Sequence, residues 1–183
     1  IYLTNAQKQA NILDVCCGSK MFWYDKQNEH TIYADIRFDN VTLCDGRRLR
    51  VEPDIIADFT KLRFAAKVFE VVIFDPPHLK RAGKTSWLAQ KYGVLPKDWE
   101  LFLAQGFAEC FRVLKPFGTL VFKWNSDQIP FSRVIKLAPE PPVFGDRSGK
   151  TRWTIFVKGA GKMAKNYMAD VAKMLGVELE EEF

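Results

Sequence analysis

The chain has 183 residues, of which 48% are hydrophobic, and 27 basic against 22 acidic side chains give it a net charge of +5. This size suits one globular domain with a single core. No apolar run approaches the ~20 residues of a membrane span, the start of the sequence shows no secretory signal, and the four cysteines include no Cys-x-x-Cys pair typical of zinc sites. We therefore expect a cytoplasmic protein with no membrane association and no bound metal.

The charge is unevenly distributed. Residues 1–162 carry 25 basic and 17 acidic side chains, a net charge of +8, whereas residues 163–183 carry 2 and 5, a net charge of −3. A basic body suits a polyanionic partner such as nucleic acid. Charge alone leaves open the alternative that these side chains only keep the surface soluble.

Four short apolar runs in the first half of the chain predict buried strands. They cover about residues 11–16, 31–36, 54–57 and 70–74. An acid stands at or directly after the end of each of the last three runs: Asp35, Asp58 and Asp75. Between the runs we expect a loop and a first helix over 19–28, and a polar segment over 37–53 with a turn at Asp45-Gly46.

The second half continues the alternation. A long loop is expected over 78–97, followed by a helix over 99–113 whose apolar residues recur at helical spacing. A strand over 119–124, a helix over 127–137 kinked or restarted at Pro130, and two last strands near 143–145 and 152–158 complete the domain. Strands that alternate with helices predict an α/β fold, with a parallel sheet and helices on both faces.

The segment Val71–His78 is the most informative motif. An apolar strand ends in Asp75-Pro76-Pro77, and because proline has no N–H the ladder stops there. In open α/β sheets ligands bind at the carboxyl ends of the strands. The motif therefore places a carboxylate and an imidazole, that of His78, at the predicted site.

These motifs resemble the class I S-adenosylmethionine-dependent methyltransferases, and Asp75–His78 resembles the Asp/Asn/Ser-Pro-Pro-aromatic motif of the amino-methyltransferases. From about Ile12 to Lys158 the chain is similar to small phage and prophage methyltransferases. The matching segments are Asp14–Trp23, Phe74–Leu79, Arg81–Lys84, Leu114–Thr119 and Arg147–Thr151. The resemblance implies a Rossmann-like, mostly parallel seven-stranded sheet with an antiparallel C-terminal hairpin, in the cytoplasm of a bacterium or a phage-infected host.

This comparison divides the chain into a methyltransferase domain over 1–158 and a linker with a short helical tail over 159–183. Residues 164–175 predict an amphipathic helix with Tyr167, Met168, Val171, Met174 and Leu175 on one side. The tail is either a terminal helix docked on the domain or a fused appendage.

The resemblance implies a site for S-adenosyl-L-methionine. The glycine turn after the first strand would contact its methionine part, an acid after the second strand its ribose, and residues after the third strand its adenine. The implied residues are Asp14, Cys16, Gly18, Asp35, Ile36, Asp58, Phe59 and Asp75. The chain departs from the family pattern because Cys16 and Lys20 stand where glycines are common.

The resemblance also implies a catalytic site of Asp75, Pro76, Pro77 and His78. The lone pair of an exocyclic amine such as adenine N6 is delocalised into the ring, so the amine is a weak nucleophile. A carboxylate and a proline carbonyl that accept its two hydrogens would favour a more reactive nitrogen. Nearby basic and aromatic residues would hold the substrate: Lys80, Arg81, Lys84, Trp87, Lys123, Trp124 and Arg147.

The function expected from these residues is methylation of a nucleobase amino group, with adenine N6 in DNA as the first choice. RNA adenine or cytosine N4, a protein amide, and a domain that binds the cofactor without turnover stay open as alternatives. Reaching N6 in duplex DNA requires flipping the base out of the stack, which costs a few kcal/mol.

Overall fold

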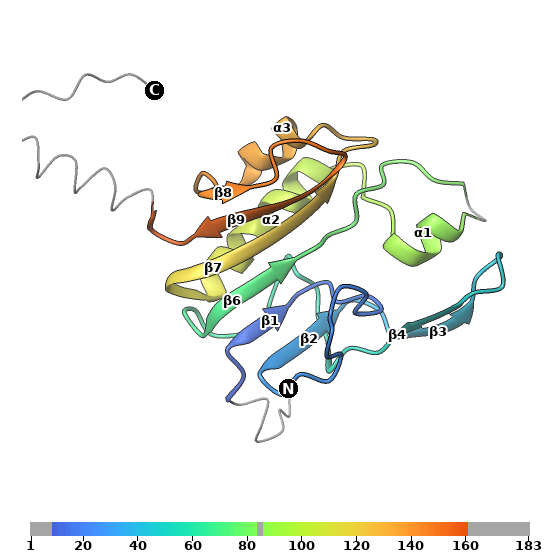
Figure 1. Ribbon diagram of the computed structural model, residues 1–183, viewed down its shortest axis with the longest axis horizontal. Helices are drawn as coiled ribbons and strands as arrows, with labels where there is room; N and C mark the ends of the chain where they lie inside the picture. The colour runs from blue at the N-terminus through green and yellow to red at the C-terminus, as the bar shows by residue number, and fades with distance from the viewer. Residues whose placement is uncertain (1–8, 84–85, 161–183) are drawn as a thin grey trace, which may run out of the picture.

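The computed structural model describes residues 9–83 and 86–160, and a seven-stranded sheet forms its centre (Figure 1). The strand order is β5-β2-β1-β6-β7-β9-β8. The strands are β1 (Ile12–Asp14), β2 (Thr31–Asp35), β5 (Ile55–Ile56), β6 (Phe69–Phe74), β7 (Leu114–Asn125), β8 (Phe144–Gly145) and β9 (Thr151–Val157). The first five are parallel, and β9 is antiparallel to both β7 and β8. The predicted sheet and its antiparallel hairpin are confirmed.

The order in which strands are added to the sheet reverses between the neighbouring parallel strands β1 and β6. The chain builds outward from β1 through β2 to β5, and then returns to the other side of β1 to build β6 and β7. Parallel strands that diverge in this way leave a crevice at their carboxyl ends, where ligands of such folds bind. The segments that follow β1 and β6 are therefore the first places to look for a site.

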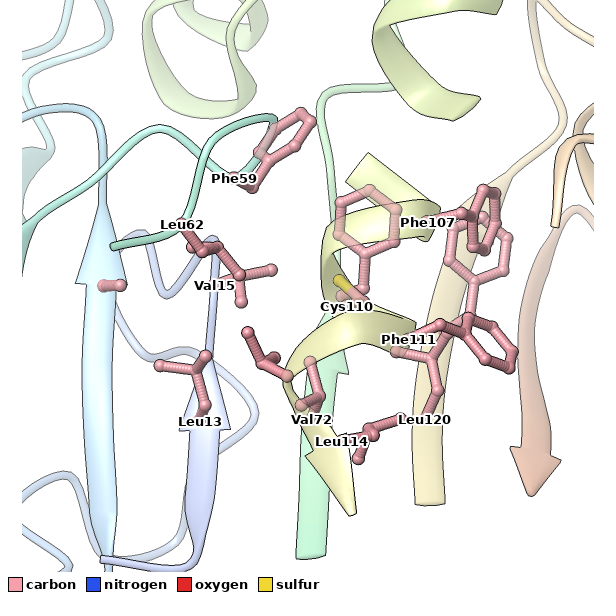
Figure 2. Packing of buried hydrophobic residues seen from close by; sticks show 14 of the residues in the cluster. Leu13, Val15, Phe59, Leu62, Val72, Phe107, Cys110, Phe111, Leu114 and Leu120 are labelled. Atoms are coloured by element: carbon pink, nitrogen blue, oxygen red, sulfur yellow. The ribbon is translucent and has the colours of Figure 1, made fainter. Parts of the chain in front are cut away.

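Helix α2 (Trp99–Val113) forms over the predicted residues and covers one face of the sheet. Its Phe107 packs against Phe74 and Phe122 with ring centroids 5.3 and 4.9 Å apart. Figure 2 shows the helix against side chains such as Val72 and Leu120, both of them fully buried. Each such side chain contributes about 1.5–3 kcal/mol by leaving water, so this face anchors the fold.

The predicted helix over 127–137 is shorter than expected. Helix α3 (Phe131–Val134) begins directly after Pro130 and passes into a 3₁₀ turn over Ile135–Leu137. Proline is favoured just before or at a helix start because it lacks an N–H that would need a partner. Val134 packs in the same buried cluster as α2, so both helices lie on the same side of the sheet.

The structure confirms the turn at Asp45-Gly46 and departs from two other expectations about local structure. Residues 19–28 form turns instead of a first helix. The polar segment 37–53 folds as an antiparallel hairpin, β3 (Asp39–Thr42) and β4 (Arg48–Val51), around the predicted turn. The loop 78–97 contains helix α1 (Trp87–Tyr92), whose Trp87 packs against the small apolar cluster of the hairpin. Trp87, a hydrophobic residue far along the sequence, thus stabilises β3 and β4, two strands with few apolar residues of their own.

None of the helices in the described ranges is long and apolar enough to span a membrane. Of the predicted second unit, the described part includes only Gly159 and Ala160, and the rest of the tail lies outside the described residues.

Candidate active site

A cavity of about 440 Å³ opens at the carboxyl ends of the central strands. The segments after β1, β2, β5 and β6 form its walls, and Lys123 of β7 and the end of α1 complete them. Among the predicted cofactor residues, seven line this cavity: Cys16, Gly18, Asp35, Ile36, Asp58, Phe59 and Asp75. The structure therefore gathers residues from four strand ends, as the topology requires.

The turn after β1 is shaped by Gly18. Its φ of 50° lies in the left-handed region, which glycine adopts without strain. The Cys17 N–H donates to the Ala34 carbonyl at 2.9 Å, which fixes the turn beside β2. The Gly18 N–H donates to Asp35 Oδ2 at 2.9 Å, so the turn and the acid after β2 form one unit. Lys20, which replaces a family glycine, also adopts a positive φ of 53°.

Asp35 is nearly buried and is held by two residues. Besides Gly18, it accepts hydrogen bonds at Oδ1 from the Arg37 N–H at 3.0 Å and from Arg37 Nε at 3.4 Å. Each carboxylate oxygen has two acceptor positions, and three of the four are filled, so Asp35 keeps one position, at Oδ2, for a hydroxyl donor of a ligand. Its place in the cavity wall suits the predicted ribose-binding role.

Arg37 is a residue that the sequence reasoning missed. Its Nη1 donates to the Gln90 carbonyl at 2.9 Å and its Nη2 to the Lys91 carbonyl at 3.4 Å. The guanidinium therefore links Asp35 to the last turn of α1, and Tyr92 and Gly93 at that end line the cavity. Only its position two residues after Asp35 could have drawn attention to it.

Asp14 lies behind the cavity wall instead of in it. The carboxyl is fully buried, and it accepts hydrogen bonds from the Cys16 N–H at 3.2 Å and from Trp23 Nε1 at 2.8 Å. Burial raises the pKa of Asp14 to about 7, against the lowering effect of these two donors. Asp14 thus shapes the turn and holds Trp23 in place.

The far end of the cavity is apolar. Phe59 is nearly buried and packs against Phe74 and Phe102, with ring centroids 5.1 and 4.7 Å apart. Asp58 Oδ1 accepts two hydrogen bonds of 2.8 Å from the backbone and hydroxyl of Thr60. Ile36 completes the wall and is 61% exposed. A flat apolar slot with a carboxylate at its rim suits an adenine ring and its amine.

Asp75 forms an ion pair with Lys123, whose Nζ lies 2.7 Å from Asp75 Oδ2. The two residues follow the paired positions Phe74 and Phe122 of neighbouring strands, which brings their side chains together. Burial raises the pKa of the Asp75 carboxyl, and the Lys123 ammonium opposes that shift. Pro76 and Pro77 line the cavity beside this pair.

An aromatic wall stands over the ion pair. Phe22 and Trp153 meet edge to face with ring centroids 5.2 Å apart, and Lys123 Nζ lies 5.5 Å from both rings. Ammonium groups at this distance are attracted by aromatic faces. Trp153 was not predicted, because its place opposite Lys123 depends on the register between β7 and β9.

His78 lies outside the cavity wall. Its ring packs 5.2 Å from that of Tyr92 and 6.4 Å from that of Trp124. Burial lowers its pKa from the usual value, which favours the neutral imidazole at pH 7. We therefore expect His78 to support Tyr92 instead of contacting the reacting atoms.

The structure separates the residues predicted to bind substrate. Lys80 and Arg81 are exposed, and both backbone N–H groups donate to Gln128 Oε1, at 2.7 and 2.8 Å. Arg147 is exposed between β8 and β9 and does not line the cavity, and Lys84 lies outside the described residues. Of the six that the structure describes, Lys123 alone lines the cavity.

The two predicted tryptophans serve the fold. Trp124 is buried and donates from Nε1 to the Ile129 carbonyl at 3.0 Å. Successive side chains of a strand point to opposite faces, so Lys123 facing the cavity sends Trp124 toward α2. Trp87 packs on the β3–β4 hairpin under the guanidinium of Arg47, 4.3 Å from its ring. Neither offers a face to the cavity.

Within the described ranges, no group of three or more His, Cys, Asp or Glu side chains is placed to hold a metal ion.

No protein-family model matches the sequence, and no curated protein matches it. Several solved structures are similar in fold. The PH0226 protein of Pyrococcus horikoshii OT3 is 18% identical over 82% of both chains, with a TM-score of 0.53. A TehB-like SAM-dependent methyltransferase of Corynebacterium glutamicum is 14% identical over 82% of this chain and 81% of that chain, with a TM-score of 0.49. NodS, an N-methyltransferase of Bradyrhizobium japonicum WM9, is 13% identical over 81% of this chain and 85% of that chain, with a TM-score of 0.48. At these identities the likeness concerns the fold alone, a mostly parallel seven-stranded sheet of Rossmann-like arrangement.

Proposed function

We propose that the protein is an S-adenosyl-L-methionine-dependent methyltransferase that acts on an exocyclic amino group of a nucleobase, with adenine N6 in DNA as the first candidate. One observation carries the proposal. Asp75 stands at the carboxyl end of the central strand β6, in the wall of the cavity that also holds Asp35 and Gly18. The acid proposed to bind the cofactor, Asp35, and the acid proposed to act in catalysis, Asp75, therefore line the same cavity.

The residues of the cavity fit the cofactor. Asp35 can accept a ribose hydroxyl at Oδ2, the Gly18 turn brings backbone close to the methionine part, and Phe59 offers an apolar wall to the adenine. A hydrogen bond to an ionised carboxylate contributes about 1.5–3 kcal/mol. When bound, S-adenosylmethionine supplies an electrophilic methyl group on its sulfonium.

The acceptor amine would meet Asp75 and Pro76. Lys123 occupies Asp75 Oδ2, and Oδ1 is left to accept one hydrogen of the amine. The Pro76 carbonyl can accept the other, because proline removes a donor from the turn but keeps its acceptor. The nitrogen gains a methyl group and gives up one proton, for which Asp75 is the neighbouring base. Positioning supplies much of the rate in such transfers.

Charge and aromatic side chains favour a nucleobase over a protein amide. Residues 1–162 carry 25 basic against 17 acidic side chains, and the rings of Phe22 and Trp153 stand beside Lys123. Aromatic stacking returns about 1–3 kcal/mol per base, enough to offset much of the cost of flipping one. The side chains of Lys80 and Arg81 are exposed and can contact phosphates of a nucleic acid.

The test is tritium transfer from labelled S-adenosylmethionine to duplex DNA, single-stranded DNA, RNA and protein extract, followed by mass spectrometry of the nucleosides. We expect label in N6-methyladenine from DNA, and weaker DNA binding as salt rises, because phosphate contacts release counterions. Label in RNA, in N4-methylcytosine or in a protein amide would replace the DNA adenine assignment. Cofactor binding without transfer to any acceptor would favour a domain without turnover.

A further inference from the structure

The two faces of the sheet are covered unequally. On the α2 side, Leu13, Val72, Leu120 and Phe156 are all 0% exposed. On the opposite side, two rows of β-branched side chains cross neighbouring strands in register and remain only partly buried. These residues, which we call the open face, are Ile12, Val71, Val121, Ile155 and Val157.

The segment after β1 covers only one end of this side. Trp23 packs edge to face on Tyr33 at 5.0 Å and buries it over β2. Beside Trp23, a hollow of about 410 Å³ lies between the aromatic residues Phe22 and Tyr24 and a floor that includes Ile73 and Val121. In Figure 1, α2 lies behind the sheet, and no described helix lies in front of β6, β7 and β9. A contiguous set of apolar side chains that stay partly exposed favours a covering segment.

The C-terminal residues 161–183 have the amphipathic sequence pattern that such a covering segment needs, and they follow β9 closely. Val157 ends β9 and belongs to the open face, and only three residues, 158–160, separate it from the segment 161–183. In a helix over 164–175, Tyr167, Met168, Val171, Met174 and Leu175 share one side, while the opposite side carries Lys165, Asn166, Asp170 and Lys173. One apolar and one polar side suit a helix that rests on a sheet.

We propose that residues 164–175 form a helix that packs its apolar side on the open face and completes the second layer of the fold. A twelve-residue helix is about 18 Å long, close to the ~23 Å of the seven β7 residues Thr119–Asn125 over which it would lie. The short connection also favours this occupant over a second copy of the chain, because a tethered segment is present at an effective concentration in the millimolar range. The inference does not depend on the proposed activity.

A photo-cross-link in the full chain tests the contact. Val171 is replaced by p-benzoylphenylalanine, and the matched control carries the same residue at Ala169, on the polar side of the predicted helix. After irradiation, peptide mass spectrometry locates the adducts. We expect intramolecular adducts between position 171 and the strands of the open face, and loss of these adducts in the control. A covalent dimer, adducts on the α2 side, or no adduct would overturn the proposal.

A pair of substitutions provides a second readout. Val171→Asp places a charge in the proposed contact, whereas Ala169→Asp places the same charge toward solvent. Burying an unpaired carboxylate is costly, so we expect Val171→Asp to lower Tm by at least roughly 2–4 °C and Ala169→Asp to leave it nearly unchanged. Equal melting temperatures of the two variants would contradict the docked helix.

Discussion

Asp35 and Asp75, two of the three carboxylates that line the cavity, are held in different ways. Asp35 accepts hydrogen bonds at both oxygens, from the Gly18 N–H and from Arg37. Asp75, within the described ranges, accepts one hydrogen bond, from Lys123 at Oδ2. Backbone and a short-range arginine fix the first carboxylate, whereas a single flexible ammonium holds the second and leaves one oxygen available.

This difference matches the two tasks that we assign to the cavity. A cofactor handle benefits from a carboxylate whose position is set before the ligand arrives. A group that must receive a hydrogen of the acceptor, and then a proton, needs a free oxygen and an adjustable charge. We infer that the Asp35 half of the cavity sets cofactor affinity and the Asp75 half sets the rate.

The strongest way to break the comparison is Asp75→Ala. We expect kcat to fall by about 10²–10³, because an orienting acceptor at the reacting nitrogen is lost, while the Kd for S-adenosylmethionine changes little. Single-turnover transfer and calorimetry measure the two quantities. The matched control is Asp45→Ala, an acid of the β3–β4 turn that pairs with Arg47 far from Asp75 along the chain. Equal loss in both variants would count against the assignment.

Asp35→Ala should show the opposite pattern. Loss of charge-assisted hydrogen bonds worth about 1.5–3 kcal/mol predicts a Kd for S-adenosylmethionine weaker by roughly 10- to 100-fold, with kcat at saturating cofactor reduced much less. Because Asp35 also holds the Gly18 turn, circular dichroism and thermal melting must show that the fold is retained. An unchanged Kd would remove Asp35 from the cofactor site.

Lys123→Met sharpens the comparison through pH. Burial raises the pKa of Asp75 and Lys123 opposes it, so removal of Lys123 raises the pKa further. Because activity needs the ionised carboxylate, the acid limb of the pH–kcat profile should move to higher pH. Activity should therefore be lost at a higher pH than in the wild type and recover as the pH rises further. Lys123→Arg keeps the positive charge, so the acid limb of its pH–kcat profile should stay close to that of the wild type. An acid limb at the same pH in Lys123→Met and in the wild type would refute the ion-pair role.

Gly106→Ala tests the apolar end of the cavity and should have the smallest effect. A Cβ at Gly106 would lie 2.7 Å from Phe74 Cζ and 2.8 Å from Phe59 Cδ2, so these rings must shift. Overpacking costs about 1–3 kcal/mol, partly offset by about 1 kcal/mol of helix propensity. We expect a Tm a few degrees lower and a modestly weaker cofactor Kd. The control is Gln105→Ala, at an exposed position of the same helix. It changes helix propensity alone and should neither lower the Tm nor weaken cofactor binding.

Part of this architecture could be predicted because its signals are local. The 3.6-residue period of the apolar side chains gave both ends of α2, and the acids after the strands placed Asp35, Asp58 and Asp75 at one edge of the sheet. Parallel strands bring their carboxyl ends together, so that inference needed no register.

The remaining features depend on contacts between distant segments. The β3–β4 hairpin is completed by Trp87, and Arg37 finds its acceptors at Gln90 and Lys91, more than 50 residues away. Sequence alone also could not decide which of Lys123 and Trp124 faces the cavity, because strand alternation separates the two but only the position of α2 assigns the faces.

The most direct test of the central claim is single-turnover methyl transfer to duplex DNA at saturating S-adenosylmethionine, with wild-type protein and Asp75→Ala side by side. The account predicts N6-methyladenine with the wild type and a rate about 10²–10³ lower with the variant, at unchanged cofactor binding. Equal rates in the two proteins would contradict the role of Asp75, and with it the division of the cavity into a cofactor half and a catalytic half.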